Sequence, residues 1–104
     1  MRIRDTTWKY YGMTKRERRI VDDFCTAPSN YNKHIINGAI KSVNPIIEKE
    51  IYNSLVHKQS YAKQNARNYI PIGEKDFYGY RRKVIHEIYK KITSMDPIEH
   101  NKPL

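Results

Sequence analysis

The most regular stretch of the sequence is residues 74–93, which read EKDFYGYRRKVIHEIYKKIT. Its apolar and aromatic residues recur every three or four positions and therefore share one face of a helix. Glu74 and Asp76 stand in the first turn, where the helix dipole favours acidic side chains. The stretch predicts an amphipathic helix from Glu74 to Thr93. The residues expected on its inner face are Phe77, Tyr80, Val84, Ile85, Ile88 and Ile92.

Two shorter helices are predicted near the beginning of the chain. Thr14 and Glu17 match the Ser/Thr-x-x-Glu capping box, which predicts a helix over residues 15–25. A second helix is expected over residues 31–43, after the break at residues 27–30. The residues expected on the inner faces of these two helices are Ile20, Val21, Phe24, Cys25, Ile35, Ile36, Ala39, Ile40 and Val43.

Two more helices are predicted between these and residue 74. Asn44 followed by Pro45 fits a helix start, with the proline at the first helical position, and a helix continues to about His57. Pro45 would equally suit a kink within one long helix. Ser60 caps a short helix through Asn68, which ends at the turn formed by residues 69–73. No segment alternates with period two, so we expect an all-α bundle of about five helices.

The length of 104 residues allows one domain. Residues 1–13 are expected to form a basic, aromatic arm, and residues 14–93 the helical domain. Residues 94–104 contain two prolines and no periodicity, which predicts a disordered tail. The chain lacks the run of about 20 apolar residues of a membrane span and an apolar segment of a secretory signal, so we expect a cytoplasmic protein.

The charge of the chain indicates a polyanionic partner. Twenty Lys and Arg stand against 11 Asp and Glu, which gives a net charge of +9. The excess lies in two blocks, residues 1–20 and residues 58–93, on either side of a nearly neutral middle. Nucleic acid is the leading candidate partner, ahead of an anionic membrane surface.

The order of short helix, turn and long basic helix over residues 60–93 favours a helix-turn-helix whose second helix enters the major groove of double-stranded DNA. Gly79 is costly inside a helix, which indicates close approach to DNA or room for a packed helix. The residues predicted to read bases are Lys75, Tyr78, Gly79, Arg81 and Arg82. The residues predicted to bind phosphates are Lys58, Ser60, Lys63, Arg67 and Lys83.

Residues 60–85, SYAKQNARNYIPIGEKDFYGYRRKVI, resemble the C-terminal half of the RinA/ArpU group of phage late-transcription regulators. Residues 16–33 show a fainter likeness to the N-terminal helix of that group. The resemblance implies a helix-turn-helix similar to region 4 of sigma factors. It also implies binding near a phage or mobile-element promoter in a bacterial host, with contact to RNA polymerase.

Enzymatic and metal chemistry gain no support from the sequence. The histidines at positions 34, 57, 86 and 100 lack ligand spacing, and no phosphate loop or nucleophile motif occurs. Glu48 and Glu50 point to different faces of a helix, unlike a catalytic pair. Cys25 fits a buried apolar position better than a reactive thiol. We therefore expect no enzyme activity, no cofactor, no metal and no small-molecule substrate.

Two other interpretations stay open. The first is a protein-interaction adaptor that docks on RNA polymerase or another phage protein. The second is single-strand binding through Trp8, Tyr10 and Tyr11, although these aromatics would also suit an arm that docks on the domain or on a second subunit. Proteins with a helix-turn-helix often form homodimers, and no dimer face is evident in the sequence.

Overall fold

The computed structural model describes the backbone of residues 1–101 and the side chains of residues 1–94. This part of the chain contains six α-helices, two short 3-10 helices (η) and no strand, which confirms the all-α fold. The elements in order are η1 (Ile3–Asp5), α1 (Trp8–Tyr11), α2 (Lys15–Cys25), α3 (Asn30–Val43), η2 (Pro45–Ile47), α4 (Glu48–Val56), α5 (Tyr61–Arg67) and α6 (Glu74–Asn101).

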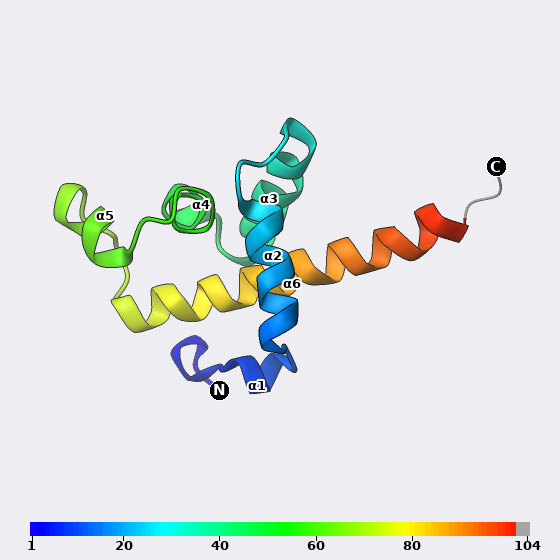
Figure 1. The fold of residues 1–104 in the computed structure, drawn as a ribbon. Coiled ribbons are helices and arrows are strands. Elements are labelled where there is room, and N and C mark those ends of the chain that lie inside the picture. The colour runs from blue at the N-terminus through cyan, green and yellow to red at the C-terminus, as the bar shows by residue number, and fades with distance from the viewer. Residues whose placement is uncertain (102–104) are drawn as a thin grey trace.

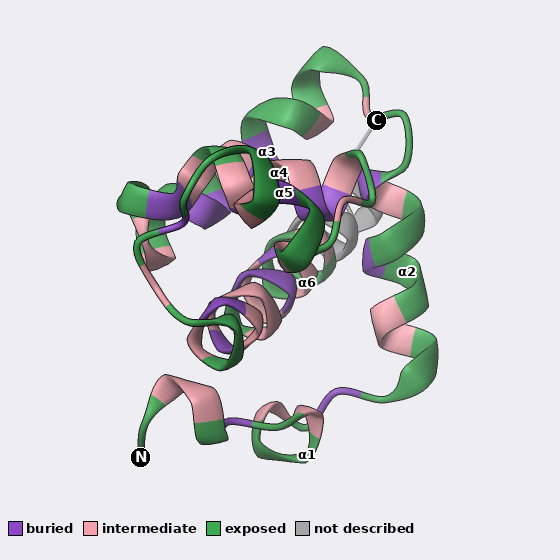
Figure 2. Ribbon diagram, turned by 90° about the vertical axis from the view of Figure 1, so that its left-hand side faces the viewer, coloured by how far each residue is buried: buried purple, intermediate pink, exposed green. Residues whose placement is uncertain are grey.

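Helix α6 is the axis around which the other elements pack. Helices α2 and α3 cross it near its middle, while α5 lies beside its first turns (Figure 1). In the view along α6, the N-terminal residues lie below it and α3, α4 and α5 lie above it (Figure 2). Helix α6 is therefore enclosed from two opposite sides.

The core forms where the apolar faces of α3, α4 and α6 meet. Ile36, Ile40, Phe77 and Ile88 are fully buried there, as the helical spacing predicts, and so is Ile51 of α4. The remaining predicted inner-face residues are buried or half-buried, with one exception.

Ile20 is the exception, because its side chain is 42% exposed. It stands at the edge of the apolar face of α2, and Val21 takes the buried position instead. Met13 and Ile70 are buried although they lie outside the predicted helices. Their burial depends on loops that fold back onto the core, which helical spacing does not reveal.

The predicted helix starts are confirmed by their hydrogen bonds. Glu17 N donates to Thr14 Oγ1 at 3.2 Å, and Thr14 N donates to the Glu17 carboxylate at 2.8 Å, so the capping box is complete. Asn44 accepts from Ile46 N at 3.1 Å, and Ser60 accepts from Lys63 N at 3.1 Å. The turn at Pro45 separates α3 from α4, so the single kinked helix is excluded.

The C-terminal end of the chain differs from the prediction, whereas the N-terminal end agrees with an arm that docks on the domain. Helix α6 continues to Asn101, beyond its expected end at Thr93, so residues 94–101 are helical rather than disordered. Residues 102–104 of the predicted tail lie outside the described residues. Residues 1–13, expected as an arm, contain η1 and α1 and are packed onto the domain.

Helix α1 is only four residues long and is fixed by its caps. Thr7 accepts from Tyr10 N at 3.1 Å, and Gly12 closes the helix in the left-handed conformation with φ of 66°. No helix in the described part of the chain is both long and apolar enough to cross a membrane.

Candidate nucleic-acid interface

The face of α6 that was predicted to read DNA is covered by the protein's own N-terminal segment. Gly79 lies at the centre of this cover. A Cβ atom added at Gly79 would stand 2.7 Å from the carbonyl carbon of Ile3 and 3.2 Å from Arg4 N. Glycine is thus required at this position because the backbone of η1 passes directly over α6. The prediction that Gly79 approaches DNA is wrong, and its alternative, room for a packed helix, is correct.

Side chains on both sides of Gly79 fasten the N-terminal segment. Arg4 donates from Nε and Nη2 to the two carboxylate oxygens of Asp76, at 2.9 and 3.0 Å. This bidentate pair holds the pKa of Asp76 below its usual value. Arg82 donates from Nη2 to the backbone oxygen of Arg4 at 3.4 Å, while its Nε is buried without a hydrogen-bond partner. The guanidinium of Arg82 therefore contributes to packing of the segment.

One turn further along α6, the aromatic residues of α1 continue this cover. The ring of Tyr11 lies 5.0 Å from the ring of His86, measured between centroids. Burial lowers the pKa of His86 below its ordinary value of 6.5. Burial thus favours the neutral form of this imidazole.

Tyr78 and Arg81, also predicted to read bases, are both half-buried and face other helices. The Tyr78 hydroxyl accepts a hydrogen bond from Tyr61 N at 3.0 Å and thereby holds the start of α5. Arg81 donates from Nε to Ser54 Oγ of α4 at 2.8 Å. Position 81 lies on the core side of α6, between the buried residues Phe77 and Ile85. Both side chains are bonded to neighbouring helices in this structure, which disfavours their predicted role at bases.

The other predicted residues divide into two groups. Lys75 and Lys83 are exposed on α6, on either side of the N-terminal segment. Lys58 has a structural task, because its Nζ donates to Asp22 at 2.8 Å and to the Leu55 backbone oxygen at 2.8 Å. Its backbone adopts the left-handed conformation, with φ of 57°, in the turn before α5. Lys58 thus fixes this turn to α2.

Helix α5 keeps an open face, in contrast to α6. Ala62, Lys63, Ala66 and Arg67 are all exposed, and their spacing places them on one side of the helix. The two alanines are small and form a strip beside the two cations, so a duplex is able to come close to the helix there. Figure 2 looks onto this end of the domain, where the ribbon of α5 is mostly exposed.

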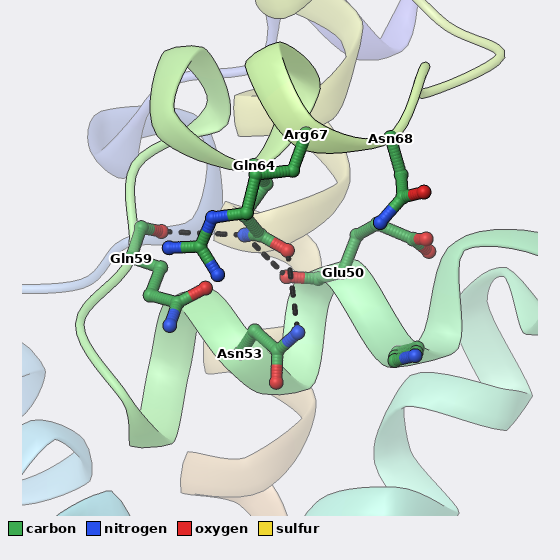
Figure 3. A pocket seen from close by; sticks show the side chains of 7 residues that line it. Glu50, Asn53, Gln59, Gln64, Arg67 and Asn68 are labelled. Carbon is green, nitrogen blue, oxygen red and sulfur yellow. Dashed lines mark hydrogen bonds between the residues drawn. The ribbon is translucent and has the colours of Figure 1, made fainter.

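The opposite face of α5 is anchored to α4 by Gln64, which is buried. Gln64 Nε2 donates to the backbone oxygens of Glu50 at 3.0 Å and Gln59 at 3.4 Å, and its Oε1 accepts from Asn53 Nδ2 at 3.4 Å (Figure 3). These residues line a polar pocket between the two helices, and the Arg67 side chain extends over it toward Gln59 (Figure 3).

The loop after α5 is anchored in a similar way. The Tyr61 hydroxyl donates to the Ile72 backbone oxygen at 2.7 Å, and Asn65 accepts from Ile70 N at 2.8 Å. Helix α5 is therefore held rigidly although it has only seven residues.

Helices α4 and α5 follow each other in the order helix, short turn, helix. Residues 57–60 connect them, and four residues is a typical length for the turn of a helix-turn-helix. The sequence prediction used α5 as the first helix of a helix-turn-helix and did not consider it as the second. Two features of the sequence could have suggested α5 as a second helix. They are the Ser60 cap soon after the end of α4 and the cations at positions 63 and 67, which are four residues apart.

In a comparison with known proteins, no family model, curated protein or solved structure matches the chain. Among the residues whose side chains are described, no three or more His, Cys, Asp and Glu come together in a group suited to a metal ion.

Proposed function

We propose that this protein binds double-stranded DNA through α5 and acts as a transcription regulator without enzymatic activity. The observation that carries the proposal is the open face of α5, where the exposed cations Lys63 and Arg67 stand one turn apart beside the small residues Ala62 and Ala66. A helix of seven residues is about 10 Å long and is narrow enough for the major groove, which is about 12 Å wide. The net charge of +9 supports a polyanionic partner.

The residues near α5 supply contacts to phosphates in this proposal. Ser60 and Lys75 are exposed at the start of α5 and the start of α6, and both elements lie at the same end of the domain (Figure 1). Lys63 and Arg67 then read base edges or the phosphates along the groove. The resemblance to the RinA/ArpU group extends the proposal to a phage or mobile-element promoter in the bacterial cytoplasm, with RNA polymerase as a further partner.

The test is a titration of a labelled random-sequence duplex with the full chain at several salt concentrations, followed by recovery and sequencing of the tightest binders. We expect affinity to fall steeply with salt, with a slope of about −0.9 for each phosphate neutralised, and we expect an enriched motif. The double variant Lys63→Ala/Arg67→Ala is expected to reduce that slope by about two and to lose the motif.

The matched control removes the same charge elsewhere. Lys41 on α3 and Lys91 on α6 are exposed and lie outside α4 and α5. Lys41→Ala/Lys91→Ala should keep both the motif and most of the affinity. Equal losses in the two double variants would contradict a role of α5. Absence of binding at low salt would contradict DNA binding altogether and favour the adaptor, for which the exposed side chains of Ile46 and Tyr69 offer docking points.

A further inference from the structure

A second site lies away from α5, in a cavity of about 220 Å³ between α1, α2, α4 and α6. Its floor is apolar and comes from three helices. Val21 and Cys25 of α2, Leu55 of α4 and Ile85 of α6 line it, and all four are buried. Burial raises the pKa of the Cys25 thiol to about 11, so this side chain is a neutral part of the floor.

One wall of the cavity carries the guanidinium of Arg81, which forms no salt bridge among the described residues, although the Asp22 carboxylate lies near enough to attract it. Arg81 is half-buried and lines the cavity. Of its five N–H donors, only Nε makes a hydrogen bond within the described part of the chain, the one to Ser54. A cation partly withdrawn from water is costly unless an anion or other acceptors compensate it. Arg81 is therefore prepared to receive an anion.

The other charged residues that line the cavity are one cation, Arg18, and one carboxylate, Asp22. Arg18 places its guanidinium 4.9 Å from the centre of the Trp8 ring, and both residues line the cavity. Asp22 also lines it, and its carboxylate is already paired with Lys58 at 2.8 Å. The balance of charge around the cavity is positive, which favours an anionic ligand.

We propose that this cavity binds a small organic carboxylate, whose carboxylate group pairs with Arg81 and whose apolar body rests on the floor beside Trp8. An inorganic anion would make no apolar contact with the four side chains of the floor. A neutral apolar molecule would offer no acceptor to the free N–H donors of Arg81. The combination of one cationic wall and one apolar floor selects a ligand with one charged end and one apolar end. Because the cavity is shared by α1, α2, α4 and α6, a bound ligand would also stabilise the packing of these helices.

The test uses benzoate as the probe and Trp8, the single tryptophan of the chain, as the reporter. Benzoate should change the Trp8 fluorescence of the full chain with a saturable curve and a dissociation constant on the order of 1 mM. Benzamide, which has the same shape without the charge, should bind at least about tenfold more weakly. A linear response to benzoate, or equal responses to the two compounds, would overturn the proposal.

Two variants test the site itself, and a third is the control. Arg81→Gln should weaken benzoate binding at least about tenfold, whereas Lys83→Gln, which removes an exposed cation of the same helix, should leave it unchanged. Cys25→Met fills the floor with a flexible apolar chain and keeps all charges, so it should also abolish binding while the far-ultraviolet circular dichroism stays unchanged. If Arg81→Gln does not fold, benzoate binding by Cys25→Met is the test of the proposal. Benzoate binding of parental strength in a folded Arg81→Gln or Cys25→Met would refute the assignment.

Discussion

Helices α5 and α6 both carry cations at helical spacing, but the surfaces around these cations differ. The face of α6 around Gly79 lies under η1 and α1, and Arg82 beside it is half-buried, although Lys75 and Lys83 are exposed. The face of α5 has no element of the described chain packed on it, and its exposed alanines keep the surface flat. A basic stripe on a helix is therefore not in itself a binding surface. The same spacing also occurs on a helix that is covered by another segment of its own chain.

The largest effect is expected from a methyl group placed under the N-terminal segment. Gly79→Ala should lower the free energy of unfolding by about 2 kcal/mol, because the new Cβ meets backbone atoms that cannot turn aside. Urea unfolding measures this change. Unchanged stability, together with unchanged protease sensitivity of residues 1–12, would show that the N-terminal segment does not pack on α6.

The second effect concerns DNA affinity and compares one arginine from each helix. Arg67→Ala should weaken binding to the selected duplex by about 1–3 kcal/mol, which is the expected loss for an arginine at a base edge. Arg82→Ala should change the affinity little, because Arg82 lies under the N-terminal segment and bonds to Arg4. Fluorescence anisotropy on folded variants measures both. The opposite order of losses would restore α6 as the recognition helix.

The third effect is a gain in the free energy of unfolding at a second glycine. This variant also serves as the control for Gly79→Ala. Gly38 lies in the interior of α3, and a Cβ atom there would meet no atom within 4 Å. Gly38→Ala should raise the free energy of unfolding by about 0.4–1 kcal/mol through the better helix preference of alanine. If both glycine variants shifted stability in the same direction, the explanation by the contact with Ile3 would fail.

The smallest effect is a pH dependence of the free energy of unfolding. It comes from the ion pair between Arg4 and Asp76, which holds the N-terminal segment on α6. Because the folded-state pKa of Asp76 is lowered, its pair with Arg4 stabilises the fold above the unfolded pKa of about 3.9. This contribution is lost as the pH falls through the folded pKa. Asp76→Asn should therefore be less stable than the parent at pH 6, with a difference that narrows below pH 4.

The control for this pH dependence is Asp23→Asn. Asp23 is exposed on α2 and its side chain forms no ion pair among the described residues, so the difference from the parent should show no such narrowing. A constant difference between the parent and Asp76→Asn across the pH range would contradict the effect of Arg4 on this carboxylate.

The sequence by itself determined the helices and most of the core. Capping signals at Thr14, Asn44 and Ser60 act within four residues, and apolar spacing acts within one helix, so both are readable locally. The tail was predicted less well, since Pro97 did not stop α6, which continues to Asn101. Loop residues such as Ile70 also escaped prediction, because they are buried by contacts with distant helices.

Only the tertiary structure decided which cations face solvent. Gly79 looks the same in sequence whether it meets DNA or the backbone of Ile3, and these two residues lie 76 positions apart. Arg81 and Lys83 are two positions apart, yet one bonds to Ser54 on the core side and the other is exposed. Side-chain spacing fixes which residues share a helical face, whereas packing between distant segments fixes what covers that face.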